Sequence, residues 1–152
     1  MHEHAAPLEL RPARVTDLPA VYRGELDYIQ TWEPTHEAAW RLDLERHLTR
    51  WSEHFSRLTV AERAGRFAGY ALWMPEAGRA ELVTLHVAPW CRRQGIAKAL
   101  LHAYARAAAT EGLSQLALSV RHDNPARHLY EQVGFVRTAT DAKGYLEYRC
   151  QA

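Results

Sequence analysis

Residues 80–120 place the strongest constraint on the fold, because they alternate strand, helix and strand. Residues 80–87 are rich in Leu and Val, as expected of a buried strand, and residues 116–120 have the same character. Between them, residues 95–112 predict a helix with its apolar side chains on one side and a glycine at its C-terminal end. A helix that joins two strands in this way normally returns the chain to a parallel partner by a right-handed crossover. We therefore expect a sheet with at least one parallel strand pair.

The remaining segments add antiparallel strands and more helices around this unit. Residues 55–61 and 67–74 form a predicted hairpin, and a Pro-Glu-Ala-Gly turn at 75–78 leads on to the strand at 80–87, which gives a three-strand meander. The other predicted elements are a strand at 8–11, helices that begin near Thr16 and Thr35, a helix after Asn124, and a closing hairpin at 135–139 and 145–148. This order predicts an α/β fold with a mixed, mostly antiparallel central sheet flanked by helices.

Composition favours one domain over residues 1–152. That length and 47% hydrophobic residues can build one sizeable core. The net charge of +1 argues against a nucleic-acid binder that works through overall charge, and no apolar run is long enough to span a membrane. The first residues, MHEHAAPLELRP, lack the pattern of a signal peptide. Cys91 and Cys150, the only cysteines, fit a reduced cytoplasm, with a single disulfide as the alternative.

The turn between the meander and the following helix has the properties of an anion site. A helix N-terminus leaves backbone N–H groups without partners, and its dipole favours negative charge there. Gly95 and Ala97 have little or no side chain, so a bulky phosphate can approach the backbone closely. Three basic residues add positive charge: Arg92, Arg93 and Lys98. The pattern is neither a Walker loop nor GxGxxG, and a solvated turn is the alternative to a pyrophosphate site.

Two motifs resemble those of the GNAT superfamily of N-acetyltransferases. Residues 92–97, Arg-Arg-Gln-Gly-Ile-Ala, resemble the motif R/Q-x-x-G-x-G/A, and a Leu- and Val-rich strand precedes them. Residues 124–135 resemble the second motif, an Asn followed by Ala-x-x-Leu-Tyr-Glu and then Gly-Phe. Both stand in the family's order, and the predicted elements agree with the family fold over nearly the whole chain.

This resemblance implies an acetyl-CoA-dependent N-acetyltransferase with a splayed, V-shaped cleft between the third meander strand and the next parallel strand. The cofactor-binding residues that it implies are Leu85, His86, Val87, Arg92, Arg93, Gln94, Gly95, Ile96, Ala97, Lys98, Asn124 and Tyr130. The strand end at 85–87 would pair with the pantetheine arm, and the amides of 93–98 would bind the pyrophosphate. Asn124 would contact the pantetheine or cap its helix. Many relatives have seven positions between this Asn and the Tyr, whereas this chain has six, so Asp123 is an alternative.

Two residues are candidates for the proton transfers. The resemblance places Tyr130 beside the thioester sulfur, where a phenol can protonate the departing thiolate. Glu81 lies on a strand with apolar neighbours, and if it faces the cleft, burial would raise its pKa and suit it as a base. Some relatives carry a glutamate on the next strand, where this chain has Ser119, so His86 or a chain of waters is a further alternative to Glu81. The histidines and cysteines show no convincing ligand spacing, and we expect no metal.

The acceptor side is less constrained. Residues 16–54 carry a net charge of −4 together with five Tyr and Trp residues, which suits a cationic amine, although a solvated helical face explains them equally well. Polyamine, amino acid, aminoglycoside, peptide N-terminus and protein lysine all stay open as acceptors. A homodimer is a further expectation, since relatives often dimerise. The rival functions are a catalytically silent acyl-CoA sensor and an interaction domain without a CoA site.

Overall fold

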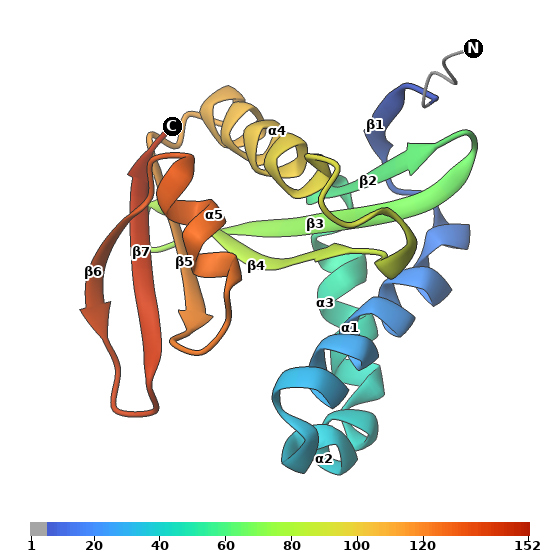
Figure 1. The fold of residues 1–152 in the computed structure, drawn as a ribbon, viewed down its shortest axis with the longest axis horizontal. Coiled ribbons are helices and arrows are strands. Elements are labelled where there is room, and N and C mark those ends of the chain that lie inside the picture. The colour runs from blue at the N-terminus through green and yellow to red at the C-terminus, as the bar shows by residue number, and fades with distance from the viewer. Residues whose placement is uncertain (1–5) are drawn as a thin grey trace.

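A seven-stranded mixed sheet forms the centre of the computed structural model, which describes residues 6–152 (Figure 1). The strands are β1 (Leu8–Pro12), β2 (Leu58–Arg63), β3 (Arg66–Glu76), β4 (Arg79–Val87), β5 (Gln115–Arg121), β6 (Val136–Thr140) and β7 (Tyr145–Gln151). Their order across the sheet is β1-β2-β3-β4-β5-β7-β6, and within it β4 and β5 are the parallel pair. The mostly antiparallel α/β sheet expected from the sequence is confirmed.

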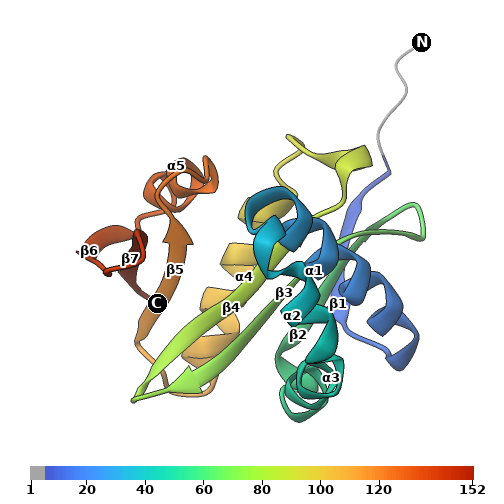
Figure 2. The same cartoon turned by 90° about the horizontal axis from the view of Figure 1, so that it is seen from below.

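The helices cover both faces of the sheet. They are α1 (Leu18–Trp32), α2 (Glu37–Leu42), α3 (Leu44–Glu53), α4 (Ile96–Thr110) and α5 (Ala126–Gln132). Helices α1 to α3 lie on one face of the β1–β4 half and α4 lies on the other (Figure 2). Two apolar clusters follow this division. One joins α4 and α5 to the sheet, and the smaller one joins Val21 of α1 and Trp51 of α3 to β2 and β3.

Two predictions for the segment between α1 and β2 are wrong. The single helix expected to begin near Thr35 is two helices, because Asp43 leaves helical geometry (φ −93°, ψ +21°) and separates α2 from α3. The strand expected to begin at Phe55 begins at Leu58 instead. Residues Phe55–Arg57 form a 3-10 turn that joins α3 to β2. An apolar side chain such as Phe55 packs against the core from either conformation, so hydrophobicity alone does not distinguish them.

The sheet splits between β4 and β5. The two strands pair from Ala80↔Leu116 to Leu82↔Leu118 and no further. A β-bulge at this point leaves Val83 without a partner on β3, because Trp73 pairs with Leu82 and Leu72 pairs with Thr84. Bulges bend a strand and increase its twist. Beyond the bulge, β4 continues along β3 as far as Val87 with one free edge, as the V-shaped cleft requires.

Candidate active site

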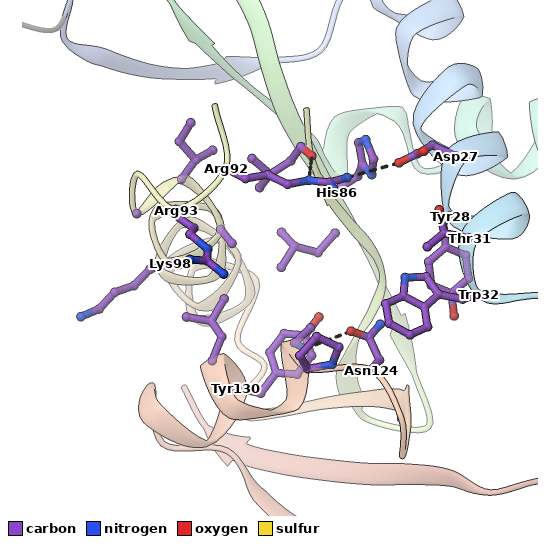
Figure 3. Close-up of a pocket in the computed structure, with 18 of the residues that line it drawn as sticks. Asp27, Tyr28, Thr31, Trp32, His86, Arg92, Arg93, Lys98, Asn124 and Tyr130 are labelled. Carbon is purple, nitrogen blue, oxygen red and sulfur yellow. Dashed lines mark hydrogen bonds and ion pairs between the residues drawn. The ribbon is translucent and has the colours of Figure 1, made fainter. Parts of the chain in front are cut away.

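A cavity of about 620 Å³ occupies the split, between the end of β4, helix α1, the turn before α4, and α5 (Figure 3). The structure brings eleven of the twelve predicted cofactor residues to its lining: Leu85, His86, Val87, Arg92, Arg93, Gly95, Ile96, Ala97, Lys98, Asn124 and Tyr130. The exception is Gln94, whose side-chain oxygen accepts a hydrogen bond from Arg63 at 2.6 Å on the outer surface. Segments far apart in the sequence thus meet at one cavity.

The turn before α4 forms a cradle of backbone amides. Gly95 is the N-cap of α4 in the left-handed conformation (φ +77°), and Arg93 also has positive φ (+63°). The first hydrogen bond of α4 runs from the Ala99 amide to the Gly95 carbonyl at 3.0 Å. Within residues 6–152, the amides of 93–98 donate to no carbonyl or side chain, so they are available to an anion. A side chain at Gly95 would meet nothing within 4 Å, so this side of the cradle is open.

Arg92 has a different position from the other basic residues of the turn. Its guanidinium donates to the Val87 carbonyl at 3.2 Å and to the Asp27 carboxylate at 3.3 Å. It therefore connects the end of β4 to α1, across the top of the cavity (Figure 3). Arg93 and Lys98 are exposed and line the cavity together with the free amides.

The free edge of β4 offers backbone groups to the cavity. The Val87 carbonyl points away from β3, since Arg92 reaches it, and Leu85 has the same orientation because strands repeat every two residues. His86 turns its carbonyl toward β3, where Gly69 makes room for it: a side chain there would lie 2.5 Å from the His86 oxygen. Burial lowers the pKa of His86, with a smaller opposing effect from Asp27, so its ring is neutral at pH 7.

Tyr130 lies on α5 at the inner end of the cavity. Its side chain is only 7% exposed, and burial raises its pKa to about 12, so the phenol keeps its proton at neutral pH. Phe135 packs edge-on against its ring, with 6.1 Å between the centroids. Asn124 caps α5, since its side-chain oxygen accepts the Ala126 amide at 2.9 Å, and it also lines the cavity. Asp123, the alternative to Asn124, instead pairs with Arg121 at 3.1 Å and is exposed.

A second cavity of about 240 Å³ lies deeper in the split, between β4, β5 and α1. Five residues line both cavities, so the two spaces meet: Tyr28, Leu85, Asn124, Ala126 and Tyr130. Glu25 of α1 and Ser119 of β5 line the smaller cavity from opposite sides of the split. Burial raises the pKa of Glu25 to about 7, and the neighbouring Thr84 and Tyr70 hydroxyls oppose that rise.

Glu81 is placed away from this site. It belongs to the part of β4 that still pairs with β5, and it lines neither cavity. Its carboxylate lies 3.5 Å from the Arg79 guanidinium on the same strand. Burial raises its pKa, but the bulge at Val83 separates it from the open part of the cleft.

Sequence reasoning did not single out Glu25. It was one of eight acidic residues between 16 and 54. The available signal was the neighbouring Gly24, because a glycine inside a helix often marks a close backbone approach. A side chain at Gly24 would lie 2.6 Å from the Tyr70 hydroxyl and 2.9 Å from the His86 ring, so α1 meets the sheet closely here.

Several other expectations concern groups outside the cavities. In residues 6–152 no three His, Cys, Asp or Glu side chains are grouped so that they could hold a metal ion; His2 and His4 lie outside that range. Cys91 and Cys150 are both free thiols, so the alternative of a single disulfide is wrong. Cys91 is buried and donates weakly to the Ala68 carbonyl, which makes it a packing residue. None of the helices within 6–152 has the length and apolar character to cross a membrane.

Comparison with known proteins assigns the chain to one family. Residues 22–135 match the family model described as "Acetyltransferase (GNAT) family". The chain therefore belongs to the GNAT acetyltransferase family, as its two motifs indicate.

The individual relatives agree with this assignment. The chain is 34% identical over 94 residues to a mycothiol acetyltransferase of Clavibacter michiganensis, which covers 61% of this chain but only 31% of the relative. It thus spans about a third of that protein's length. A ribosomal-protein-alanine N-acetyltransferase from Brucella melitensis superposes with a TM-score of 0.76 at 26% identity, over 95% of this chain and 99% of that one. The PaiA N-acetyltransferase of Thermoplasma acidophilum, solved with coenzyme A, gives a TM-score of 0.76 at 18% identity, over 96% and 99%.

Proposed function

We propose that the chain is an acetyl-CoA-dependent N-acetyltransferase that transfers the acetyl group directly to an amine of a small molecule, peptide or protein. One observation carries the proposal. The free amides of residues 93–98 and the protonated Tyr130 hydroxyl line the same cavity, one at its outer part and the other at its inner end. A cofactor with a pyrophosphate at one end and a thioester at the other is the ligand that such a cavity suits.

The residues of the larger cavity have distinct roles in this proposal. The amides of 93–98, with Arg93 and Lys98, bind the pyrophosphate. The backbone groups of Leu85 and Val87 pair with the amides of the pantetheine arm along the free edge of β4. Arg92 holds that strand end against Asp27 of α1 and keeps the cavity's width fixed. That coenzyme A is present in the PaiA structure supports this assignment of the ligand.

The reaction needs a polarised carbonyl and an acid for the leaving group. A backbone amide at the end of β4 near Val87 polarises the thioester carbonyl when the pantetheine lies along this strand. The amine nitrogen attacks that carbon, a C–N bond forms and the C–S bond breaks. Tyr130 gives its phenolic proton to the departing thiolate. The high pKa of Tyr130 ensures that the proton is present at neutral pH.

A panel of amines tests this proposal. The protein is mixed with acetyl-CoA and, in turn, spermidine, an amino acid, an aminoglycoside, an alanine-initiated peptide and a lysine-containing peptide, while CoA release is followed and the products are weighed by mass spectrometry. Amine-dependent CoA release with a product 42 Da heavier is the expected result, since acetylation replaces one hydrogen by an acetyl group. A rise in melting temperature with CoA but no turnover would mark an acyl-CoA sensor. No rise in melting temperature would mark an interaction domain.

Further properties belong to the same proposal. The Brucella relative is named for an alanine of a ribosomal protein, which supports including an alanine-initiated peptide among the acceptors. The amine enters beside α1, where the smaller cavity lies. We further propose a single domain, a cytoplasmic location and a homodimer. Sedimentation of the purified chain checks the last of these.

A further inference from the structure

Glu25 is the one carboxylic acid within residues 6–152 that lines the smaller cavity. The other polar side chains there are hydroxyls and an amide, from Tyr28, Thr84, Ser119, Asn124, Tyr130 and Tyr145. None of these accepts a proton readily at neutral pH. Ser119 of β5, at the position where some relatives carry a glutamate, lines the same cavity as Glu25. The chemistry of the cavity therefore depends on a residue of α1.

The packing of α1 fixes where Glu25 points. Val21 is completely buried, and its carbonyl accepts a hydrogen bond from the Tyr70 hydroxyl at 3.2 Å. One turn later, Gly24 lies so close to Tyr70 and His86 that a methyl group would not fit. This close approach brings the carboxylate of Glu25 to Thr84, the first residue of β4 beyond the bulge. Glu25 is thus held at the point where the split begins.

We propose that Glu25 is the catalytic base, and that it takes a proton from the ammonium form of an alkyl amine bound in the smaller cavity. This inference rests on the proposed acetyltransferase function and assigns its missing base. Alkyl ammonium groups have pKa values near that of lysine, about 10, so most of the acceptor is protonated at pH 7 and cannot attack. A carboxylate in a confined cavity both attracts the cation and removes its proton, directly or through one water molecule.

The protons balance over the whole reaction. The ammonium group gives one proton to the Glu25 carboxylate, and the neutral nitrogen then attacks the thioester carbon. Tyr130 gives its proton to the thiolate, and the second proton that leaves nitrogen replaces it. Glu25 finally releases its proton to solvent, so that each turnover yields an amide, a thiol and one proton. The two cavities meet at Tyr130, so Glu25 and Tyr130 serve the nitrogen and the sulfur from opposite sides.

The surroundings of Glu25 allow its titration to be recognised. The titratable or charged groups around it are Arg50 from α3, Tyr70 from β3, His86 from β4, Tyr130 from α5, Tyr145 from β7 and Tyr28 from its own helix. Burial raises the pKa of all four tyrosines, and an arginine keeps its charge at every assay pH. The pKa of His86 is lowered by burial. A rate limb near pH 7 that does not move with the pKa of the acceptor's own amine therefore belongs to Glu25.

The experiment compares Glu25→Gln, Glu25→Asp and the control Glu9→Gln with the wild type. Glu9 is exposed on β1 and lines neither cavity, so its variant makes the same change of carboxylate to amide elsewhere. The acceptor is whichever of spermidine and the alanine-initiated peptide gives the faster CoA release, measured at saturating acetyl-CoA from about pH 6 to about pH 10. CoA binding by calorimetry shows in each variant that the fold and the larger cavity are intact.

The expected result is a pH-dependent defect. At pH 7, Glu25→Gln should lose roughly a hundredfold in kcat, and the deficit should shrink toward pH 10, where solvent supplies the neutral amine. Glu25→Asp should recover part of the rate, and Glu9→Gln should match the wild type. A rate for Glu25→Gln equal to that of the wild type, or a deficit of the same size at every pH, would overturn the assignment of Glu25 and leave the acetyltransferase function standing. A wild type that acetylates no amine overturns both.

Discussion

The Tyr130 hydroxyl is a single group on which the proposed chemistry depends. Tyr130→Phe removes it and keeps the ring that packs on Phe135, so the core should be nearly unchanged. General acid catalysis is typically worth about 10²–10⁴-fold, and water partly substitutes for it in an open site, so we expect kcat to fall by roughly ten- to a thousandfold. Acetyl-CoA affinity by calorimetry should change little.

Tyr22→Phe is the matched control for this variant, because Tyr22 packs at a tilt against Trp40 and lines neither cavity. It should keep the wild-type kcat. Weaker CoA binding with an unchanged kcat in Tyr130→Phe would instead make Tyr130 a cofactor-binding residue, and the acid would have to be sought elsewhere.

Gly95 is the second residue with a specific expectation. Gly95→Glu places a carboxylate in the amide cradle, where the proposed pyrophosphate binds, and should weaken CoA binding by roughly a hundredfold or more. Gly78→Glu is a close control. Gly78 has φ +79° against +77° for Gly95, a side chain at either glycine meets nothing within 4 Å, and Gly78 lies in the turn between β3 and β4. Equal CoA affinities of the two variants by calorimetry would remove the cradle assignment.

The carboxyl group of Glu25 should also be visible in the stability of the protein. Burial raises its pKa from 4.5 to about 7. Below pH 4.5 the group is protonated in both the folded and the unfolded chain. Between pH 4.5 and 7 the unfolded chain ionises first, so this group makes the free energy of unfolding fall as pH rises, until the folded chain ionises too.

Glu25→Gln removes that dependence. We expect the variant to be more stable than the wild type by about 1–3 kcal/mol at pH 8, and the difference to vanish near pH 4. Urea unfolding of both proteins at pH 4, 6 and 8 measures it. A difference that is the same at all three pH values would show that the buried carboxyl does not titrate in this window.

At the scale of elements, the position of α1 depends on the absence of a side chain at Gly24. Gly24→Ala gains up to about 1 kcal/mol of helix propensity. The added methyl group, however, would lie 2.6–2.9 Å from the Tyr70 and His86 side chains, and overpacking typically costs about 1–3 kcal/mol. Since Tyr70 is completely buried and cannot move aside, we expect α1 to shift outward and carry Glu25 with it.

The measurable consequence of Gly24→Ala is a lower melting temperature together with a loss of amine turnover that exceeds any loss of CoA affinity. Thermal unfolding and the CoA-release assay give the two values. A variant that is more stable than the wild type and equally active would mean that the added methyl group fits without moving α1.

The same elements show how far the sequence determined the structure. The strand–helix–strand unit and the cradle could be predicted, because Leu/Val-rich strands, an apolar helical stripe and a glycine at a turn are local signals. The face of the sheet on which an individual side chain lies could not be predicted in this way. Whether Glu81 reaches the cleft depends on where β4 and β5 separate and on one bulged residue, Val83, and such a bulge changes which residues face the split. The role of Glu25 depends on a contact between α1 and β3, whose residues Gly24 and Tyr70 lie 46 positions apart in the sequence.

At the scale of the whole molecule, charge is divided between the two sides of the cleft. Residues 16–54, which contain α1 to α3, carry a net charge of −4, and the remaining residues carry +5. Helix α1 lies on one side of the larger cavity, and the cradle with Arg93 and Lys98 lies on the other (Figure 3). A cationic acceptor and an anionic cofactor are thus each attracted to a different side of one cleft.

This division predicts a salt response that depends on the charge of the acceptor. Between about 20 mM and about 500 mM NaCl, screening should raise the KM of a cationic alkyl amine by roughly two- to fivefold. An arylamine, which is uncharged at pH 7.5, should show almost no change when it replaces the alkyl amine. Asp27→Asn removes one charge from α1, and Glu33→Gln removes one from its C-cap. Each should reproduce at low salt part of the rise in the KM of the alkyl amine. These two side chains also hold Arg92 and Tyr145, respectively, so a loss of kcat or CoA affinity can accompany the change.

A variant on the outer surface separates the electrostatic effect of the acidic helices from the contacts that Glu33 and Asp27 make. Asp43→Asn/Glu45→Gln/Glu53→Gln removes three negative charges from exposed positions at the ends of α3, and none of the three residues lines either cavity. At low salt it should raise the KM of the cationic amine toward the high-salt value, while kcat and the KM of the arylamine stay constant. If neither salt nor the removal of these charges changes the KM of the alkyl amine, the acidic residues of α3 are only a solvated face. The acceptor is then selected inside the split, by Glu25 and the walls of the smaller cavity.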